Sequence, residues 1–388
     1  MMHLNAFTQI TPHSQAIGQW KHPEDQMASG YLDLDVWVKI AKTLEKGCLD
    51  ALFIADIHGF YDGYGSNRDA AVRNAVQSPA VDPMLLISAL ALNTKYLGIG
   101  CTYSTSYHPP YECARAFTSL DHFTNGRVGW NIVTSYVKNV YENGLGEMLD
   151  HDARYDKAEE YMEVVYKLWE SSWENDAVVQ DTVKDIHTDP SKVHEINHEG
   201  DFFSVKGPHM CEPSIQRTPF LFQAGASPKG IDFAAKHAEG VLVRFDSPEH
   251  ASKRMKLYKD KMESYGRDPN NLKFMMTFTP VIGETESEAN KKNEGFMKYQ
   301  SDDGLLALFG GHTGIDLKGL DRDKPLSDMD SDGMQFIAKS RIPSLNLVCS
   351  VKKHPFSGSV SVINFFSSQK LNSSPLTLFS NNVSLIKS

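Results

Sequence analysis

Short apolar runs alternate with amphipathic stretches along most of this 388-residue chain. The segment Asp50–Asp56 is an almost wholly apolar run of strand length. It follows the stretch Leu34–Lys46, in which Trp37, Ala41 and Leu44 recur at helical spacing. This alternation is typical of βα units, which build a parallel sheet that helices cover on both faces.

The pattern predicts an α/β fold, a (β/α)8 barrel of the TIM type, with seven strands identifiable along the chain. The predicted strands are Leu4–Phe7, Asp50–Asp56, Leu97–Ser104, Arg127–Thr134, Pro219–Gln223, Gly240–Phe245 and Lys273–Ile282. Helices are predicted at Leu34–Lys46, Pro83–Asn93 and Tyr111–Phe123, with others beginning at Tyr155, near Ser227 and near Ser247.

Two segments are too long to be simple connections between a strand and a helix. They are Glu174–Arg217 and Ser301–Ser331. Long segments of this kind are usually functional in compact domains. We therefore expect both to be insertions that lie over one mouth of the barrel.

The C-terminal end departs from the barrel pattern. No Asp or Glu follows Asp332, and the chain becomes rich in serine. We expect a barrel domain over residues 1–340 and an aberrant tail over 341–388, with the last βα unit missing or replaced. A disordered tail, a divergent end and translated non-coding sequence are the alternatives, and the last is favoured. The run Ser359–Phe366 is a candidate for the vacant strand.

Composition narrows the functional class. The chain is 41% hydrophobic and 23% charged with a net charge of -10, which is typical of a soluble globular protein and argues against nucleic acid or an anionic membrane as partner. Its five cysteines stand far apart, so neither a disulfide framework nor a thiolate zinc site is expected. No secretory leader or membrane-spanning run is apparent, so a cytoplasmic location is expected.

Polar residues stand where the predicted strands end. Asp56 closes the second strand, Thr102 lies near the end of the third, and Asn131 and Thr134 lie near the end of the fourth. In barrels of this type the active site is built at the carboxyl ends of the strands. The alternative is that these residues only cap turns or helices, which short polar side chains also favour.

The segment Gly225-Ala226-Ser227 follows the fifth predicted strand and precedes Pro228. Small residues before a helix allow backbone N–H groups to approach a phosphate, and proline suits the first helical turn. A tight β-to-α turn without a ligand would use the same residues, so both interpretations stay open.

His151, Arg154 and Tyr155 lie within five positions at a predicted helix start. Arginine and tyrosine side chains suit an anionic ligand. Alternatively, Asp152 caps the helix and Arg154 forms a surface ion pair. His194 and His198 stand four positions apart, but a zinc role for them is not favoured. The motifs GxSxG and GxGxxG are missing from the sequence, which argues against a serine hydrolase and a Rossmann nucleotide site.

Several longer blocks of the sequence resemble a known protein family. Asp50–Asp56, His151–Asp156 and the segment from Thr188 to His209, continuing to Gln223-Ala-Gly225, resemble the bacterial-luciferase-like FMN-dependent monooxygenases. The likeness covers about Met1 to Lys339. It is strongest to the branch that contains nitrilotriacetate monooxygenase component A, dibenzothiophene sulfone monooxygenase and long-chain alkane monooxygenase, and the last looks closest.

The resemblance implies the oxygenase component of a two-component system. Such a protein uses reduced FMN (FMNH2), supplied by an NAD(P)H-dependent flavin reductase, and molecular oxygen to oxidise a small organic substrate, and a homo-oligomer is expected. Together with the strand-end pattern, it indicates cofactor-binding roles for Asp56, Thr102, Asn131, His151, Tyr155, Ala226 and Ser227. It also indicates catalytic or pocket roles for Tyr61, Gln77, Tyr136 and Arg154.

Some pocket positions depart from the family pattern. Thr11 and Ser14 align with a cysteine and a histidine, although His13 is adjacent. Tyr136 and Leu308 align with two histidines, and His312 is a possible substitute for one of them. An inactive, truncated flavin-binding homologue and a deazaflavin-dependent dehydrogenase of the same superfamily are therefore kept as alternatives.

Overall fold

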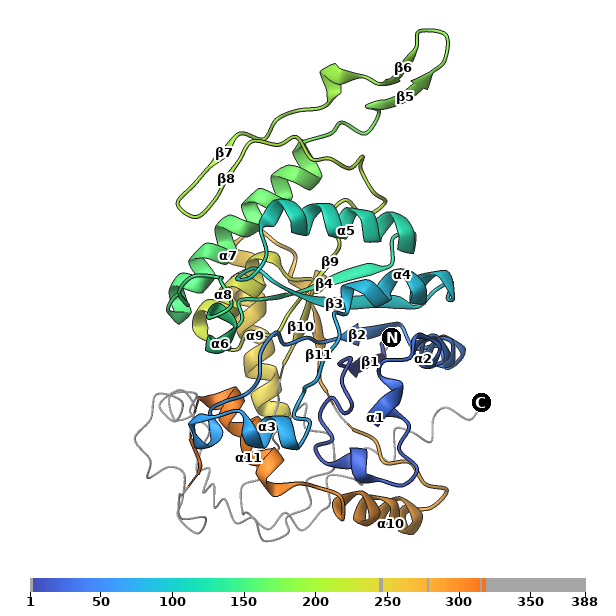
Figure 1. Ribbon diagram of the computed structural model, residues 1–388. Coiled ribbons are helices and arrows are strands. Elements are labelled where there is room, and N and C mark those ends of the chain that lie inside the picture. The colour runs from blue at the N-terminus through green and yellow to red at the C-terminus, as the bar shows by residue number, and fades with distance from the viewer. Residues whose placement is uncertain (1–2, 244–246, 278, 315, 319–388) are drawn as a thin grey trace.

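The computed structural model describes residues 3–243, 247–277, 279–314 and 316–318, and its centre is a parallel sheet of seven strands (Figure 1). The order across the sheet follows the order along the chain, β1-β2-β3-β4-β9-β10-β11, which confirms the predicted barrel order. The strands are β1 Asn5–Thr8, β2 Ala51–Ile54, β3 Gly98–Ser104, β4 Val128–Val133, β9 Phe220–Gln223, β10 Gly240–Leu242 and β11 Lys273–Met275.

The sheet curls so far that its two outer strands approach each other. The side-chain amide Nδ2 of Asn5 in β1 lies 3.2 Å from Sδ of Met275 in β11. The predicted strand Lys273–Ile282 is too long, because β11 ends at Met275. The run Ser359–Phe366 and the domain boundary at residue 340 lie outside the described residues.

Phenylalanines from three strands fill the inside of the curled sheet. Phe53 stacks on Phe7 at 5.6 Å between ring centroids and meets Phe222 edge-on at 5.2 Å. Glycines on the strands between them make room for these rings. A Cβ atom at Gly100 would lie 3.1 Å from Phe222, and one at Gly129 would lie 2.7 Å from the same ring. The interior below the strand ends is therefore a packed core.

The Gly129→Ala variant is expected to lose about 1–3 kcal/mol of unfolding free energy, because the new methyl group must displace Phe222. Chemical denaturation measures this loss. Gly295→Ala is the matched control, since nothing lies within 4 Å of its Cβ position in a helix, and it should stabilise the protein by up to about 1 kcal/mol. Equal effects of the two substitutions would contradict the packing explanation.

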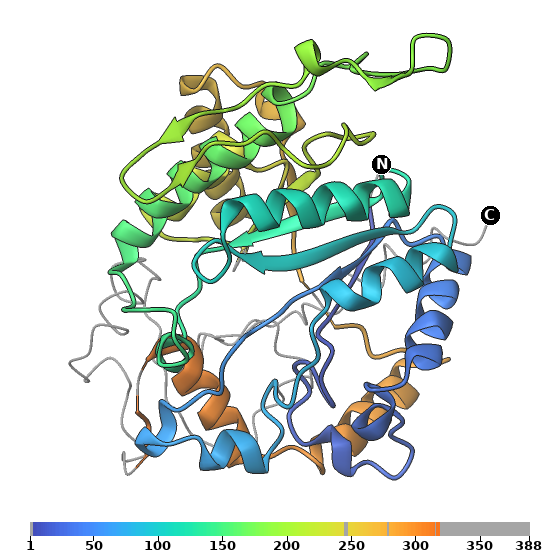
Figure 2. The same cartoon turned by 45° about the horizontal axis from the view of Figure 1, so that its top comes forward.

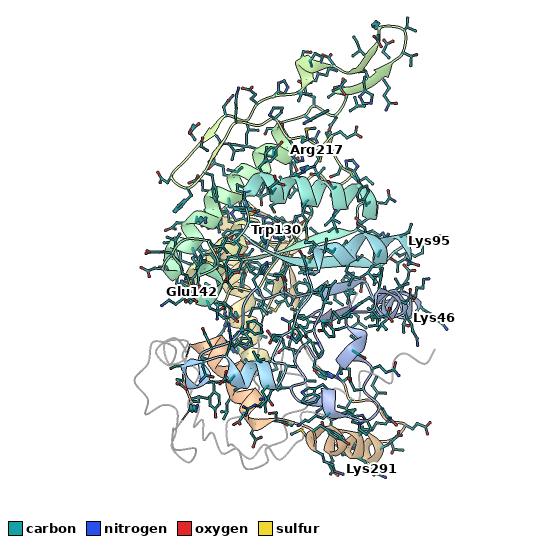
Figure 3. The ribbon with its side chains drawn as sticks, in the orientation of Figure 1. Lys46, Lys95, Trp130, Glu142, Arg217 and Lys291 are labelled. Carbon is teal, nitrogen blue, oxygen red and sulfur yellow. The ribbon has the colours of Figure 1, made fainter. Side chains whose placement is uncertain are left out.

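Helices cover the outside of the sheet, and Figure 2 shows α4 and α5 lying along the strands. Trp130 of β4 points outward, is fully buried and packs against Phe117 of α5 and Trp169, with ring centroids 5.5 and 6.1 Å away (Figure 3). None of the helices in the described ranges is long and apolar enough to cross a membrane. The helices are α1 Met27–Gly30, α2 Leu34–Lys46, α3 Asp69–Arg73, α4 Met84–Leu92, α5 Pro110–Thr124, α6 Lys138–Tyr141, α7 His151–Tyr166, α8 Pro228–His237, α9 Pro248–Ser264, α10 Glu286–Met297 and α11 Asp302–Thr313.

The segment Glu174–Arg217 does not cover the barrel mouth, so that prediction is wrong. It forms two hairpins, β5 Val178–Asp181 with β6 Ile186–Thr188, and β7 His198–Glu199 with β8 Ser204–Val205. They extend beyond α5 and α7 on the outer side of the molecule (Figure 1). The Glu160 carboxylate of α7 holds the second hairpin by accepting hydrogen bonds from the backbone N–H groups of Phe202 and Phe203.

The described part of the second predicted insertion does lie at the carboxyl ends of the strands. Its helix α11 packs beside α3, and Ala307 and Leu308 are buried in one cluster with Tyr61, which follows β2. The expectation of an insertion over the barrel mouth therefore holds for this segment as far as residue 318.

Candidate functional site

Thr102 and Asn131 face each other on neighbouring strands. They are register partners of β3 and β4, and Asn131 Nδ2 donates a hydrogen bond of 2.8 Å to Thr102 Oγ1. Both side chains are buried, and Asn131 Oδ1 has no hydrogen-bond partner in the described part of the chain. An unpaired buried acceptor costs about 1–3 kcal/mol, so this amide is suited to a ligand that brings an N–H donor.

Asp56 follows β2 and is not a solvated turn residue. Its side chain is only 14% exposed, and this burial raises the pKa of the carboxyl group, partly opposed by His58, whose Nδ1 lies 3.4 Å away. The alternative that Asp56 merely caps a turn in solvent is therefore wrong. Asp56 therefore pairs with His58, whereas Thr102 and Asn131 pair with each other.

The loop Gly225–Ser227 forms the turn from β9 into α8. Ser227 caps α8, because its Oγ accepts a hydrogen bond of 3.1 Å from the N–H of Gly230, and Pro228 occupies the first helical turn as expected. The loop also meets Tyr155 closely. A Cβ atom at Gly225 would lie 2.4 Å from the Tyr155 hydroxyl oxygen, and one at Gly230 would lie 2.7 Å from it.

The helix that carries Tyr155 begins at His151, not at Tyr155 as predicted. The first turn is helical because Arg154 N–H bonds to the carbonyl of Asp150, which stands at the N-cap position. His151 is partly exposed, pairs with Asp152 at 2.7 Å and has its ring 5.2 Å from that of Tyr155. The alternative interpretation, in which Asp152 caps this helix, is therefore wrong, because Asp150 stands at the N-cap position.

Arg154 is buried, which excludes the surface ion pair considered from the sequence. Its Nη1 donates a hydrogen bond of 2.7 Å to the carbonyl of Leu149, and its Nε has no partner in the described ranges. Burial raises the pKa of Tyr155, opposed in part by hydrogen bonds to Thr134, Gln223 and Ser227 and by the charge of Arg154. Tyr155 is thus a neutral hydroxyl donor next to a cation.

Tyr61, Gln77 and Tyr136 come together although they lie far apart in the sequence. Tyr61 Oη donates to Gln77 Oε1 at 3.0 Å and lies 3.2 Å from Tyr136 Oη. Burial raises the pKa of the Tyr61 phenol, which therefore remains neutral at physiological pH. Gln77 has a φ of 51°, a conformation that non-glycine residues adopt at a cost of about 1–3 kcal/mol and often at functional sites.

Gln9 belongs to the same network and was not singled out from the sequence. Its Nε2 donates to Gln77 Oε1 at 3.2 Å, and its Oε1 accepts from Ser14 Oγ at 3.2 Å. The available signal was its position directly after β1, the same signal that identified Asp56. Of the departures from the family pattern, Ser14 therefore joins this cluster, and His312 lies edge-on to Tyr61 at 5.3 Å.

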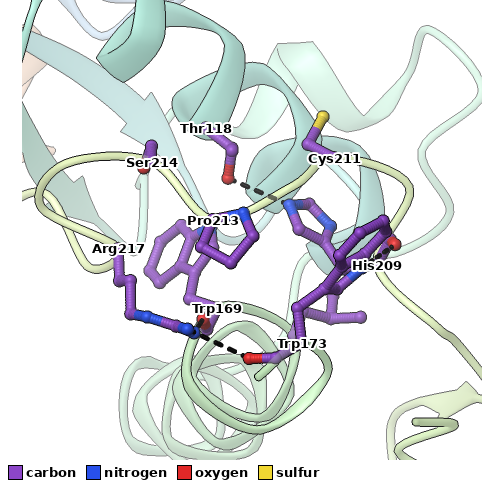
Figure 4. Close-up of a pocket in the computed structure, with 9 residues that line it drawn as sticks. Thr118, Trp169, Trp173, His209, Cys211, Pro213, Ser214 and Arg217 are labelled. Atoms are coloured by element: carbon purple, nitrogen blue, oxygen red, sulfur yellow. Dashed lines mark hydrogen bonds between the residues drawn. The ribbon is translucent and has the colours of Figure 1, made fainter. Parts of the chain in front are cut away.

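A crevice lies between the hairpin insertion and the outer helices (Figure 4). Its volume of about 10 Å³ is comparable to that of one water molecule, so it holds no organic substrate. His209 and Arg217 of the insertion form hydrogen bonds to α5 and to the residues that follow α7. His209 Nε2 lies 2.9 Å from Thr118 Oγ1, and the Arg217 guanidinium donates to the carbonyls of Trp169 and Trp173.

Burial lowers the pKa of His209 to about 4. Between about pH 6.5 and pH 4 the unfolded chain then binds a proton that the folded protein does not, so stability falls with falling pH. The His209→Gln variant should reduce this slope by up to about 1.4 kcal/mol per pH unit. Urea unfolding at several pH values measures the slope. The exposed His187→Gln variant is the control, and an unchanged slope in His209→Gln would contradict the prediction.

Comparison with known proteins places these residues in a family. The sequence model described as luciferase-like monooxygenase matches residues 11–332. The chain belongs to this family. The chain is 49% identical over 317 residues to the long-chain alkane monooxygenase of Geobacillus thermodenitrificans (strain NG80-2), covering 81% of this chain and 72% of the relative. It is 45% identical over 338 residues to the dimethyl-sulfide monooxygenase of Hyphomicrobium sulfonivorans, covering 87% of this chain and 70% of that protein.

The fold of the chain is also similar to that of a solved structure. The crystal structure of long-chain alkane monooxygenase matches with a TM-score of 0.82 and 47% identity, over 85% of this chain and 76% of that one. Dibenzothiophene-sulfone monooxygenase and nitrilotriacetate monooxygenase component A are further relatives. The resemblance inferred from the sequence is confirmed.

Proposed function

We propose that this protein is the oxygenase component of a two-component system, which uses reduced FMN and molecular oxygen to oxidise a small organic substrate. One observation carries the proposal. The unpaired amide oxygen of Asn131 and the loop at Gly225 beside Tyr155 lie at the carboxyl ends of the neighbouring strands β4 and β9, where they would offer an acceptor for a ring N–H and a site for a phosphate. The family assignment agrees with this use.

The two ends of the cofactor would be held by different elements. Tyr155 and Ser227, with the backbone of Ala226, would bind the phosphate, aided by the positive charge of Arg154. Thr102 and Asn131 would hold the ring. Bound reduced flavin supplies the electrons with which oxygen is activated.

The protein's own contribution is to orient the ring and to surround the reacting atoms with neutral groups. Asp56 lies 3.4 Å from His58, and burial raises the pKa of its carboxyl group, so this carboxyl group would be the one to exchange a proton beside the ring. His151 would close the phosphate end from the solvent side. Tyr61 donates its hydroxyl hydrogen to Gln77, so the neighbouring hydroxyl group of Tyr136, 3.2 Å from Tyr61 Oη, would be the hydrogen-bond donor to an oxygen atom of the substrate.

We further propose that the substrate is largely apolar. Tyr61 lies in a cluster with Ile17, Val137, Ala307 and Leu308, which excludes water from the space around its hydroxyl. The curated relatives named above are monooxygenases of long-chain alkanes and of dimethyl sulfide. The departures from the family pattern that the resemblance implies fall at nearby polar positions, so the individual substrate must be found by assay.

Anaerobic titration of the purified protein with reduced FMN tests the proposal, followed by oxygen uptake with an added NAD(P)H-dependent flavin reductase. We expect saturable binding and oxygen-dependent conversion of at least one apolar compound in a panel of n-alkanes and dialkyl sulfides. Binding of a deazaflavin cofactor in place of FMN would favour the dehydrogenase alternative. Binding without turnover would favour an inactive homologue.

The homo-oligomer, the reductase partner and the cytoplasmic location remain predictions. Light scattering on the purified protein checks the first of them. The reductase requirement is checked by omitting the reductase from the oxygen-uptake assay and supplying chemically reduced FMN.

A further inference from the structure

Two side chains of α9 hold the loop Gly225–Ser227 by its carbonyl groups. Tyr258 Oη donates a hydrogen bond of 3.1 Å to the carbonyl oxygen of Gly225, and Arg254 Nη2 donates one of 3.0 Å to that of Ala226. The two residues are four positions apart, so they lie on one face of the helix. Tyr258 is almost completely buried, which leaves its ring little freedom to move.

These two hydrogen bonds determine which way the loop presents its N–H groups. In a trans peptide the C=O and N–H bonds point in opposite directions. Fixing the carbonyls of Gly225 and Ala226 toward α9 therefore directs the N–H groups of Ala226 and Ser227 away from α9. Neither N–H group has a hydrogen-bond partner within the described ranges.

Arg254 also brings positive charge to this loop. No carboxylate of residues 3–243, 247–277, 279–314 or 316–318 forms an ion pair with its guanidinium. The nearby Lys229, in contrast, is paired with Asp156 at 2.6 Å. A charged donor on the carbonyl of Ala226 polarises the peptide group, so the N–H of Ser227 becomes a stronger donor to an anion.

We propose that Arg254 and Tyr258 are positioning residues, which preorganise the loop for the phosphate group of FMN and so let the protein select FMN over riboflavin. The inference rests on the proposed function, because it assigns the loop to the phosphate. Neither side chain needs to touch the cofactor. The N–H groups that they orient make the contact, and rigid preorganised donors bind an anion more tightly than mobile ones.

Binding of two flavins that differ only in the phosphate tests the inference. Reduced FMN and reduced riboflavin are titrated anaerobically into wild-type protein and the variants Tyr258→Phe, Arg254→Met and Arg254→Lys. We expect Tyr258→Phe to weaken FMN binding about threefold to tenfold and Arg254→Met about tenfold or more, with Arg254→Lys between wild type and Arg254→Met. Riboflavin binding should stay within about twofold in all of them.

Matched controls lie close to the two residues. Arg267 donates to the carbonyls of Ala235 and Ala238 at the other end of α8, and Tyr265 at the end of α9 bonds to Asp232. Arg267→Met and Tyr265→Phe should leave the ratio of FMN to riboflavin affinity unchanged. Equal loss of both flavins in the α9 variants, or no loss, would overturn the inference. Wild-type protein that binds neither flavin would overturn the proposed function itself.

Discussion

The Gly225→Ala variant is expected to bind reduced FMN about tenfold to a hundredfold more weakly than the wild type. Its new Cβ atom would lie 2.4 Å from the Tyr155 hydroxyl oxygen, a distance that real atoms do not tolerate. The phenol must move away from the loop, and with it the proposed phosphate contact. Displacements of this kind cost about 1–3 kcal/mol, and each 1.4 kcal/mol is a factor of ten in affinity.

Removing the hydroxyl group separates this explanation from a general loss of stability. Tyr155→Phe alone should weaken FMN binding, because a donor to the phosphate is lost. Adding Gly225→Ala to Tyr155→Phe should then cost less than it costs in the wild type, since the closest clash no longer exists. Titrations of the four proteins form the double-mutant cycle. Strictly additive effects would show that the alanine acts elsewhere.

The double variant Thr102→Val with Asn131→Leu is expected to abolish the stabilisation by FMN without destabilising the ligand-free protein. Without a ligand, Asn131 Oδ1 is a buried acceptor that lacks a partner among the described residues. Replacing both members of the Thr102–Asn131 pair removes that cost and leaves no half of the pair unsatisfied. The melting temperature of the apoprotein should therefore stay equal or rise, whereas the shift caused by added FMN should disappear.

Single variants provide the comparison for this second prediction. Thr102→Val alone leaves both ends of the Asn131 amide unpaired, so it should lower the melting temperature of the apoprotein. Differential scanning calorimetry with and without FMN measures both quantities. A double variant that melts well below the wild type, yet keeps its FMN-dependent shift, would contradict the role given to this pair.

Much of the fold could be predicted because its elements have local causes. The apolar run Asp50–Asp56 reflects a strand that is buried on both faces, and β2 is present there. The helical spacing in Leu34–Lys46 reflects a helix that is buried on one face, and α2 is present there. Helices were predicted to begin near Ser227 and near Ser247, and each of these serine side chains accepts an N–H group at the start of its helix, as an N-cap residue does. Helix α7 began earlier than predicted because its first turn is polar, which hides helical periodicity.

The residues of the candidate site also differ in whether they could be identified from local sequence. Thr102 and Asn131 could be identified because strand ends can be located from the chain itself. The cluster of Tyr61, Gln77 and Tyr136 came from the resemblance alone, since 16 and 75 positions separate its hydrogen-bonded pairs. Arg254 was missed for a similar reason, because it meets Ala226 across 28 positions.

The sequence by itself determined that this chain forms βα units in barrel order, that polar groups stand at the strand ends, and that it resembles the flavin-dependent luciferase-like enzymes. Only the tertiary structure decided that Arg154 is buried, that the insertion Glu174–Arg217 packs outside α5 and α7, and that α9 holds the loop at Gly225. Periodicity and capping depend on neighbours a few residues apart. The direction of a long loop and the burial of a charged side chain depend on which distant surfaces meet when the sheet curls.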